Sequence, residues 1–336
     1  MDEYIEKKRL TILKIIKNRS NPISSNEIAS TLKEMGYDIS ERTVRFDLLA
    51  LDNEGFTEYQ YKKGRKITEK GMKEISKARV FNKLGFLTAK IDQMTYKMDF
   101  DISSMTGTVV LNTSIIEKKY LKQTAPLLQR VFEHRLGMGS FMTLIPAGEW
   151  GEWGIIPEGS VGIGTVCSIT INGILLTQGI PTRSRFGGLL EMVNNEPKRF
   201  VALINYDGTS LDPLEIFINS GMTDYLGATS TGDGLIGASF REIPYEGRDK
   251  VIEISKKLDK TGLGAFMKIG YPEQDLCGIP VNSGTFGTII VGGLNPVAIL
   301  VESGFYVESK ALSGLVDFKK LFHYKELDTH IKKILG

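Results

Sequence analysis

The chain has 336 residues, of which 41% are hydrophobic and 24% are charged, and its net charge is +2. This length is enough for two domains, and the composition is that of an ordinary folded protein, which excludes long disordered regions. No apolar stretch approaches the roughly 20 residues that span a bilayer, and Met1–Tyr4 lacks the basic start of a signal peptide. We therefore expect a cytoplasmic protein without a membrane partner.

Metal-binding and disulfide-stabilised classes are disfavoured as well. The two cysteines, Cys167 and Cys277, lie far apart, and the three histidines are scattered along the chain. Neither the CxxC spacing of a zinc site nor the dense cysteine pattern of a disulfide framework is present. We expect no metal and no resident cofactor.

Positive charge is concentrated near the N-terminus. Residues 1–80 contain 17 basic and 13 acidic side chains, whereas residues 81–336 contain 25 and 27. This asymmetry fits a nucleic-acid-binding domain attached to a neutral body. We place the two domains at residues 1–80 and 81–336.

Two helices are predicted before residue 36. Glu3–Arg19 has apolar residues on one face, and Pro22 stops this helix because proline cannot donate a helical hydrogen bond. Ser24 and Glu27 have the spacing of a capping box, which predicts a second helix that runs to Glu34. The residues expected to be buried on this second helix are Ile28, Leu32 and Met35.

A third helix is predicted to begin at Ser40, which is a favourable N-cap residue. Phe56–Tyr61 alternates like a strand, residues 62–65 form a basic turn, and Lys66–Thr68 begins a return strand. The expected buried face of the third helix consists of Val44, Leu48 and Leu51.

Three helices followed by a basic hairpin are typical of a winged helix-turn-helix domain, whose third helix enters the major groove of double-stranded DNA. Arginine suits this role because its guanidinium pairs with O6 and N7 of guanine, while basic residues of the wing reach phosphates. The alternative is a winged helix used only for protein contacts, with its charges solvated. The candidate DNA-binding residues are Ser40, Arg42, Thr43, Arg45, Lys62, Lys63 and Arg65.

Residues 81–336 show a mixed pattern of helices and strands. Helices are predicted at Tyr120–Arg135, with an interruption near Pro126, and at Ile252–Leu258. The fold class is therefore α+β, with a winged helix followed by a mixed α/β sensing domain. Short apolar runs predict strands at Thr108–Leu111, Phe141–Ile145, Ser168–Ile171, Phe200–Ile204, Ile216–Ile218, Thr288–Val291 and Ala298–Val301.

A weak internal repeat is visible in this second domain. Gly164–Thr165 and Gly284–Thr285 each open a β-rich run, and Asp212–Pro213 and Asn295–Pro296 each precede a predicted strand. Recurring glycines and polar stretches of this kind indicate two related halves with a ligand cleft between them.

The segment Pro181–Gly188 contains the most suggestive chemistry of this domain. In an extended backbone, arginines two residues apart project from the same side. Gly187–Gly188 then lets the backbone approach a ligand before a helix that we expect to begin near Leu189. The alternative is a basic surface loop with a structural glycine turn. The candidate donors to a carboxylate or phosphate are Thr182, Arg183, Ser184 and Arg185.

The winged helix, together with Val161–Cys167, Ile180–Gly188 and the glycine-rich run near Ala228, resembles the archaeal nitrogen-regulatory repressor family, NrpR. The resemblance covers essentially the whole chain. It implies a repressor that binds palindromic operators near nitrogen-assimilation promoters and is released by 2-oxoglutarate, a signal of nitrogen shortage. Some members carry two sensing domains and this chain has room for one, so the expected partner is a second copy, giving a homodimer, or another sensing-domain protein.

2-Oxoglutarate carries two carboxylates and a keto oxygen, so its site needs a cationic fork and several further donors. We expect Arg241 to bind the second carboxylate. The resemblance does not supply effector residues, and this assignment, like that of residues 182–185, rests on chemistry alone.

Two other functions remain open. One is regulation by a different small molecule, such as an amino acid or a nucleotide. The other is an enzyme domain fused to a winged helix, as in bifunctional biotin ligases, whose adenylate loop Thr182–Gly188 matches only loosely. The chain has no P-loop, GxSxG or HExxH motif, so we expect no enzyme activity.

Overall fold

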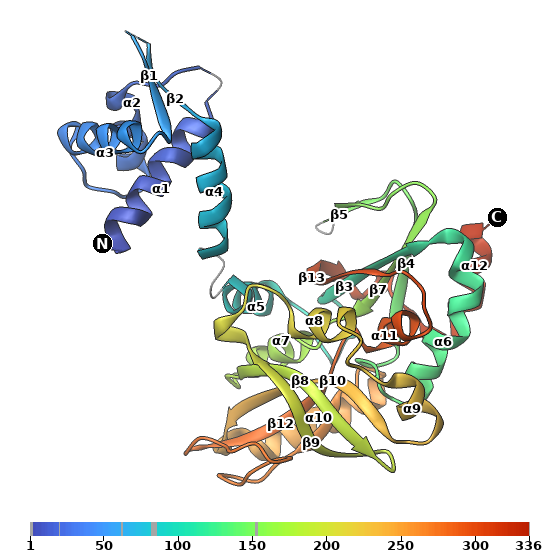
Figure 1. Cartoon of the computed structure of the whole chain (residues 1–336). Helices are drawn as coiled ribbons and strands as arrows, with labels where there is room; N and C mark the ends of the chain where they lie inside the picture. Colours follow the sequence, from blue (N-terminus) through green and yellow to red (C-terminus); the bar gives the residue numbers. More distant parts are fainter. Residues whose placement is uncertain (1–2, 20, 62, 82–85, 152–153, 336) are drawn as a thin grey trace. The chain divides into compact units, whose positions relative to one another are not determined.

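The computed structural model describes residues 3–19, 21–61, 63–81, 86–151 and 154–335 (Figure 1). The chain divides into two compact units, Met1–Leu84 and Gly85–Gly336. Each unit has its own hydrophobic core. Among the described residues, no helix is both long and apolar enough to cross a membrane.

The first unit is a winged helix-turn-helix domain, as the sequence predicts. Its helices and its two-stranded antiparallel wing follow one another in the expected order. The elements are α1 (Glu3–Lys17), α2 (Ser25–Glu34), α3 (Glu41–Asn53), β1 (Thr57–Gln60), β2 (Gly64–Ile67) and α4 (Glu69–Phe81).

Side-chain caps fix where α2 and α3 begin. Ser24 and Glu27 form the predicted capping box in both directions, and the Ser40 hydroxyl accepts a hydrogen bond from the Thr43 amide. The predicted buried residues of α3 are confirmed, but Met35 is 59% exposed because α2 ends one residue before it. The core of the unit consists of Ile12, Leu13, Ile15, Ile16, Ile23, Ile28, Leu32, Val44, Leu48, Leu51 and Ile75.

The second unit contains helices and two five-stranded sheets. Its helices are α5 (Phe86–Lys97), α6 (Leu121–Glu133), α7 (Thr170–Thr177), α8 (Pro213–Asn219), α9 (Tyr225–Ser230), α10 (Arg248–Thr261), α11 (Asn295–Glu302) and α12 (Leu327–Leu335). Single 3₁₀ turns are η1 (Lys118–Tyr120), η2 (Tyr206–Gly208), η3 (Tyr245–Gly247), η4 (Phe318–Lys320) and η5 (Tyr324–Glu326).

The strands of the two sheets come from distant parts of the chain. One sheet has the order β11-β12-β10-β8-β9 and the other has the order β13-β3-β7-β4-β14, and all pairs are antiparallel. The strands of these two sheets are β3 (Thr108–Glu117), β4 (Phe141–Ile145), β7 (Ser160–Val166), β8 (Arg183–Val193), β9 (Glu196–Asn205), β10 (Gly234–Pro244), β11 (Phe266–Ile269), β12 (Thr285–Val291), β13 (Glu308–Asp317) and β14 (Phe322–His323). The short strands β5 (Trp150–Gly151) and β6 (Gly154–Ile155) form a separate two-stranded sheet.

The second unit contains an internal duplication. The order strand, 3₁₀ turn, helix, strand, strand, helix, strand occurs twice, first from β3 to β8, where the short strands β5 and β6 are inserted between β4 and β7, and then from β10 to β13. β7, α7 and β8 begin 125 residues before β12, α11 and β13. The register differs from the one expected from sequence, because Gly164 corresponds to Ile289 rather than to Gly284. Similarly, α11 corresponds to α7 and not to α8.

Each repeat donates its last strand to the sheet of the other repeat. β8 of the first repeat pairs with β10 of the second, and β13 of the second pairs with β3 of the first. As a result, each of the two hydrophobic clusters of this unit takes residues from both sheets. Helices α6 and α11 contribute to one cluster, while α7 and α10 contribute to the other.

Three predicted strands are wrong. Ser168–Ile171 overlaps the start of α7, Ile216–Ile218 lies inside α8, and Ala298–Val301 lies inside α11. These helices are short and mostly buried, so their sequences show continuous apolar runs that periodicity cannot distinguish from strands. The proline in the first turn of α8 and of α11 was the available signal for a helix.

Two further predictions about helices are wrong. No helix begins near Leu189, because the whole segment Arg183–Val193 is strand β8. α6 runs continuously through Pro126. Pro126 is the sixth residue of α6, so it removes the hydrogen bond that its amide would have donated to the Lys122 carbonyl, but it does not end the helix.

The equivalent loops of the two repeats meet directly. The Gly139 amide donates to the Gly264 carbonyl at 3.0 Å, and the Ser140 amide donates to the Gly262 carbonyl at 2.7 Å. A Cβ atom on Gly139 would lie 2.5 Å from the Gly262 oxygen. This close approach of two backbones requires glycine.

We expect Gly139→Ala to destabilise the second unit more than Gly179→Ala. Both glycines have a positive φ, 69° and 75°, so each alanine adds a left-handed backbone cost of about 1 kcal/mol. Only at Gly139 does the new Cβ also collide with backbone, whereas nothing lies within 4 Å of a Cβ at Gly179. Thermal unfolding should therefore give the Gly139→Ala variant a lower Tm by several degrees, which corresponds to about 1–3 kcal/mol of overpacking. Equal Tm values would contradict a close contact at these loops.

Candidate DNA interface and candidate effector site

The N-terminal half of α3 exposes the residues predicted to contact DNA. Ser40 and Arg42 are exposed, and the half-buried Thr43 has its hydroxyl 3.0 Å from the Ser40 hydroxyl. The Arg45 side chain is 64% exposed, and its guanidinium lies 2.7 Å from the Glu41 carboxylate. Hydrogen bonds from Ser25 and then from Arg45 lower the pKa of Glu41. The structure thus places all four residues at one end of an exposed, capped helix.

The wing presents fewer free cations than the sequence suggests. Lys63 is exposed at its tip, and Lys62 lies outside the described residues. Arg65 is different, because its side chain is only 12% exposed and its Nε lies 2.8 Å from the Asp52 carboxylate. Since Asp52 also accepts a hydrogen bond from Thr57, Arg65 fastens the wing to the end of α3. Its position is that of a structural residue rather than a phosphate contact.

Sequence reasoning missed an apolar component of this surface. Phe46 is 64% exposed and Leu49 is 53% exposed, and both lie on α3 one and two turns after Arg42. Residues at this spacing share a helix face. A large exposed apolar side chain beside arginines can contact the methyl group of thymine, as apolar residues do in the major groove. The available signal was two large apolar residues outside the buried stripe of α3.

The segment Thr182–Arg185 begins strand β8 and does not form a loop before a helix. Arg183 is exposed, whereas Arg185 donates to the Glu242 carboxylate at 3.0 Å and to the Pro280 carbonyl at 2.6 Å. Gly187 packs against Pro213, and so its role is to allow close packing rather than ligand approach. Arg185 is therefore occupied by a buried carboxylate.

A β-bulge separates the predicted effector residues into two groups. The register shifts between Phe240 and Arg241, so that Phe240 lies opposite Phe186 while Arg241 lies opposite Ser184. Arg185 lies over the Phe240 ring and binds Glu242, on one face of the sheet. Arg241 points to the other face, where its Nη2 donates to the Ser168 carbonyl at 2.9 Å. Arg183 and Arg185 therefore do not join Arg241 in one site, contrary to the prediction.

Arg241 is buried without a carboxylate partner. It is 0% exposed, and its Nε and Nη1 atoms have no hydrogen-bond acceptor among the described residues. Burial lowers its pKa to about 10, and the nearest groups that act on it electrostatically are Tyr206 and Cys167. Burial also raises the pKa of the Cys167 thiol to about 12 and raises that of Tyr206. Both neighbours are therefore neutral at physiological pH, and neither balances the guanidinium.

One polar group that contacts Ser184, and another just before β8, lack hydrogen-bond partners among the described residues. Ser184, opposite Arg241, accepts a hydrogen bond from the Asn172 amide at 3.0 Å, but the Asn172 carbonyl oxygen has no donor among the described residues. The half-buried Thr182 hydroxyl is likewise unpaired. A cavity of only about 10 Å³ is lined in part by Cys167, Tyr206 and Asp212. Ser168, whose carbonyl accepts from Arg241, also lines it, but Arg241 itself does not.

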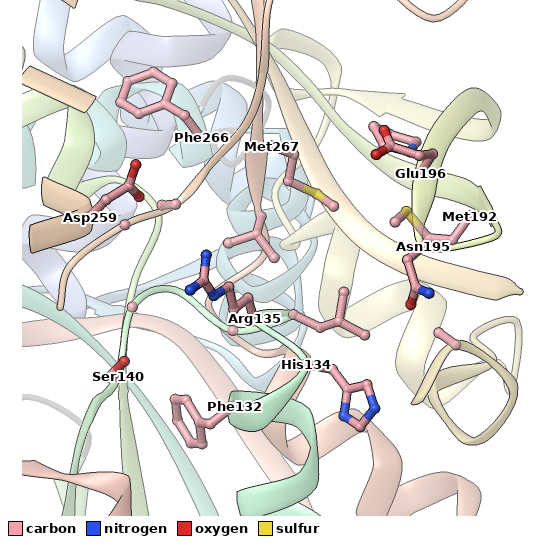
Figure 2. Close-up of a pocket in the computed structure, with 18 of the residues that line it drawn as sticks. Phe132, His134, Arg135, Ser140, Met192, Asn195, Glu196, Asp259, Phe266 and Met267 are labelled. Carbon is pink, nitrogen blue, oxygen red and sulfur yellow. The ribbon is translucent and has the colours of Figure 1, made fainter. Parts of the chain in front are cut away.

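A second, larger cavity of about 500 Å³ lies where the equivalent loops of the repeats meet (Figure 2). Figure 2 shows Asp259 and Ser140 on one side of it and Asn195 and Glu196 on the other, with Arg135 between them. The carboxylates in its lining outnumber the arginine. Among the described residues, no group of three or more histidines, cysteines or acidic residues is placed to hold a metal ion.

Two carboxylates lie at the start of helix α8, and one of them, Asp212, lines the cavity beside Ser168. Asp212 caps the helix by accepting from the Leu214 and Glu215 amides, and Glu215 accepts from the Ala311 amide of β13. Burial raises the pKa of Asp212 to about 6 and that of Glu215 to about 7. Both groups therefore titrate near physiological pH.

These features define the class of protein as a winged-helix transcriptional regulator with a duplicated α/β domain. Residues 84–323 match the family model described as NrpR regulatory domains NRD1 and 2, and residues 10–75 match that of the ribonuclease R winged-helix domain. The chain belongs to the NrpR family of nitrogen regulators.

Named relatives and a solved structure agree with this assignment. The global nitrogen regulator NrpRI of Methanosarcina mazei is 35% identical over 96% of this chain and 99% of its own length. NrpR of Methanococcus maripaludis is 32% identical over 96% of this chain, which spans only 55% of that protein. The crystal structure of a nitrogen repressor-like protein from Methanococcus jannaschii is also similar, with a TM-score of 0.60 and 31% sequence identity. The match covers 70% of this chain and 97% of the chain in that structure.

The raised pKa of Glu215 predicts a pH-dependent stability. Between pH 4.5 and 7 the folded protein keeps a proton on Glu215 that the unfolded chain has released, so stability falls as the pH rises through this window. Glu215→Gln removes the titration and keeps an oxygen to accept from Ala311. We expect the Tm of the wild type to fall more between pH 5 and pH 8 than that of the variant. Parallel profiles would contradict the buried state of Glu215, and the exposed Glu253→Gln is the control.

Proposed function

We propose that this chain is a transcriptional repressor of nitrogen-assimilation genes that binds palindromic operator DNA and is released by 2-oxoglutarate. The observation that carries the DNA-binding part is the pair of exposed arginines, Arg42 and Arg45, on the capped α3 of a winged helix. Membership of a family whose named members are global nitrogen regulators supports the regulatory part.

In this proposal α3 enters the major groove with its N-terminal residues toward the base edges. Arg42 contacts a guanine, and the Ser40 and Thr43 region lies near phosphates, where the positive end of the helix favours negative charge. Arg45 exchanges its bond with Glu41 for a phosphate or a base. Lys63 of the wing binds the backbone, while Arg65 keeps the wing in position through Asp52.

A palindrome presents two half-sites, so we propose that two copies of the chain bind together as a homodimer. Their recognition helices then lie about 34–36 Å apart, which is one turn of B-DNA. The effector acts by changing this separation, so that both helices no longer dock at once. A partner with a second sensing domain is the alternative to the homodimer.

A second candidate effector is an amino acid rather than 2-oxoglutarate. The observation that favours it is the cavity of about 500 Å³, whose lining contains both Arg135 and the carboxylates of Asp259 and Glu196. Opposite charges across one cavity suit a zwitterion. A dianion such as 2-oxoglutarate would be repelled by the excess of carboxylates there.

We expect Arg42→Ala to weaken operator binding by about 1–3 kcal/mol and to relax specificity, because it removes a contact with a base. Lys63→Ala should weaken binding to all sequences and reduce the salt slope of log K by about 1, because it removes one phosphate contact. Fluorescence anisotropy over a salt series measures both effects. Lys256→Ala, an exposed lysine of α10 in the other unit, is the charge-matched control. An unchanged affinity of the Arg42→Ala variant for the operator would contradict the assignment of α3 as the recognition helix.

The repressor proposal itself is tested by titrating the protein onto a palindromic duplex from a nitrogen-assimilation promoter at fixed salt. Salt must be fixed because phosphate contacts make affinity steeply salt-dependent. We expect 2-oxoglutarate to weaken binding and glutamate to have no effect. If glutamate acts and 2-oxoglutarate does not, the amino-acid regulator is the correct reading. If the protein binds the operator specifically and neither compound changes the affinity, both effector proposals fail and the DNA-binding proposal stands.

A further inference from the structure

The buried guanidinium of Arg241 has no counterpart in the other repeat. η3 begins 127 residues after η1, so Arg241 in β10 corresponds to Ser114 in β3. β13 begins 125 residues after β8, so Ser184 in β8 corresponds to Ser309 in β13. The strand registers agree, because Arg241 lies opposite Ser184 and Ser114 lies opposite Ser309. In the β3–β13 pair, the Ser114 and Ser309 hydroxyls hydrogen-bond to each other at 2.8 Å.

This comparison shows that the fold does not need a cation at this position. Two neutral serines complete the same strand pair in the equivalent place. An unpaired charge removed from water is costly to the folded state. Stability therefore does not account for an arginine that is 0% exposed with two unpartnered nitrogen atoms. An anion that binds to the folded protein does account for it.

We propose that Arg241 binds one carboxylate of the small-molecule effector, in a site closed by α5 and η2 that must open to admit the ligand. The inference rests on the proposed function, whose effector residues it assigns, and it excludes Arg183 and Arg185. The ligand class is a small carboxylate.

This side of the sheet offers hydrogen-bond donors to an anion, although Asp212 in the wall of the cavity adds one carboxylate. Arg241 has N–H donors on Nε and Nη1 that are unpaired among the described residues, and its Nη2 donates to the Ser168 carbonyl just before α7. The hydroxyl of Tyr206 lies close enough to influence the pKa of Arg241. By contrast, the positive charge of Arg185 is already balanced by the Glu242 carboxylate, to which it is bound.

The site must open because the cavity beside Ser168, which Arg241 itself does not line, is small. Its volume of about 10 Å³ holds roughly one water molecule, far less than a dicarboxylate. Ile91 of α5 and Tyr206 of η2 are in its wall. These two elements also contact each other, since the Thr88 hydroxyl donates to Asp207 at 3.2 Å. We therefore expect entry of the ligand to displace part of this wall, to which α5 and η2 contribute together with α8 and β13.

The identity of the displaced helix connects the site to regulation. α5 is the first helix of the second unit and comes next in the chain after α4 of the winged helix. It packs on α7 and on β13 within the second unit (Figure 1). A ligand at Arg241 that moves α5 thus acts on the element that leads into the DNA-binding unit.

The test compares Arg241→Met with Arg185→Met in the full chain. Arg241→Met removes an unbalanced buried charge and keeps the side-chain volume, so we expect an unchanged or higher Tm without ligand and no thermal shift with 2-oxoglutarate. Its Kd for 2-oxoglutarate should rise on the order of 10- to 100-fold, because a charged hydrogen-bond donor is lost. Arg185→Met leaves Glu242 without its cation, so we expect a lower Tm with a normal 2-oxoglutarate shift.

A normal 2-oxoglutarate response in Arg241→Met would overturn the site and leave the repressor proposal standing. If the wild type ignores 2-oxoglutarate, the effector proposal fails, and a panel of oxaloacetate, citrate and glutamate then tests the site alone. A carboxylate that stabilises the wild type but not Arg241→Met supports it. A panel in which no carboxylate stabilises the wild type overturns it.

Amide hydrogen exchange of the wild type keeps the proposal testable if Arg241→Met does not fold. We expect 2-oxoglutarate to change exchange in α5, η2 and the first turn of α7. Changes confined to residues 132–140 and 259–267 would place the ligand in the larger cavity and overturn the assignment to Arg241.

Discussion

The exchange of β8 and β13 between the two repeats is the constraint on which the second unit depends. Each repeat lacks a complete sheet until the last strand of the other repeat joins it. The exchange makes both hydrophobic clusters common to the two repeats, and it brings equivalent loops together at Gly139 and Gly264. Neither half of this unit can therefore bury its core alone.

The same exchange creates two strand pairs that are equivalent in position but different in chemistry. In one, β3 and β13 meet through serine hydroxyls. In the other, β10 carries adjacent buried residues of opposite charge, Arg241 and Glu242, on opposite faces of the sheet. Glu242 is fully satisfied by Arg185 and Asn282, whereas Arg241 is not. The two equivalent strand pairs thus differ in that only one carries buried charges, and of these Glu242 is paired while Arg241 has no carboxylate partner among the described residues.

In the winged helix, charge is likewise divided between structure and surface. Asp47 holds the buried Lys8 at 2.8 Å, and Asp52 holds Arg65. These pairs fix α1 and the wing against α3, because a partly buried ion pair restricts both of its elements. Arg42, Arg45 and Lys63 remain exposed, and so do Lys17, Arg19, Lys33, Lys66, Lys70 and Lys73 among the described residues of this unit. A rigid domain with a few exposed cations at one helix end is suited to binding a regular polyanion.

The sequence alone determined the winged helix, because its signals are local. The capping box at Ser24, the N-cap Ser40 and the apolar stripe of α3 each depend on residues a few positions apart. It also determined the α+β class and indicated a duplication, since both follow from the order of elements.

Tertiary structure decided the rest. The short buried helices α7, α8 and α11 resemble strands in sequence because burial on all sides removes their periodicity. The partners of Arg185 and Arg241 depend on one bulge and one strand exchange, which join residues more than 50 positions apart. No pattern of neighbouring residues records such contacts, so only the fold could separate the arginine that is occupied from the arginine that is available.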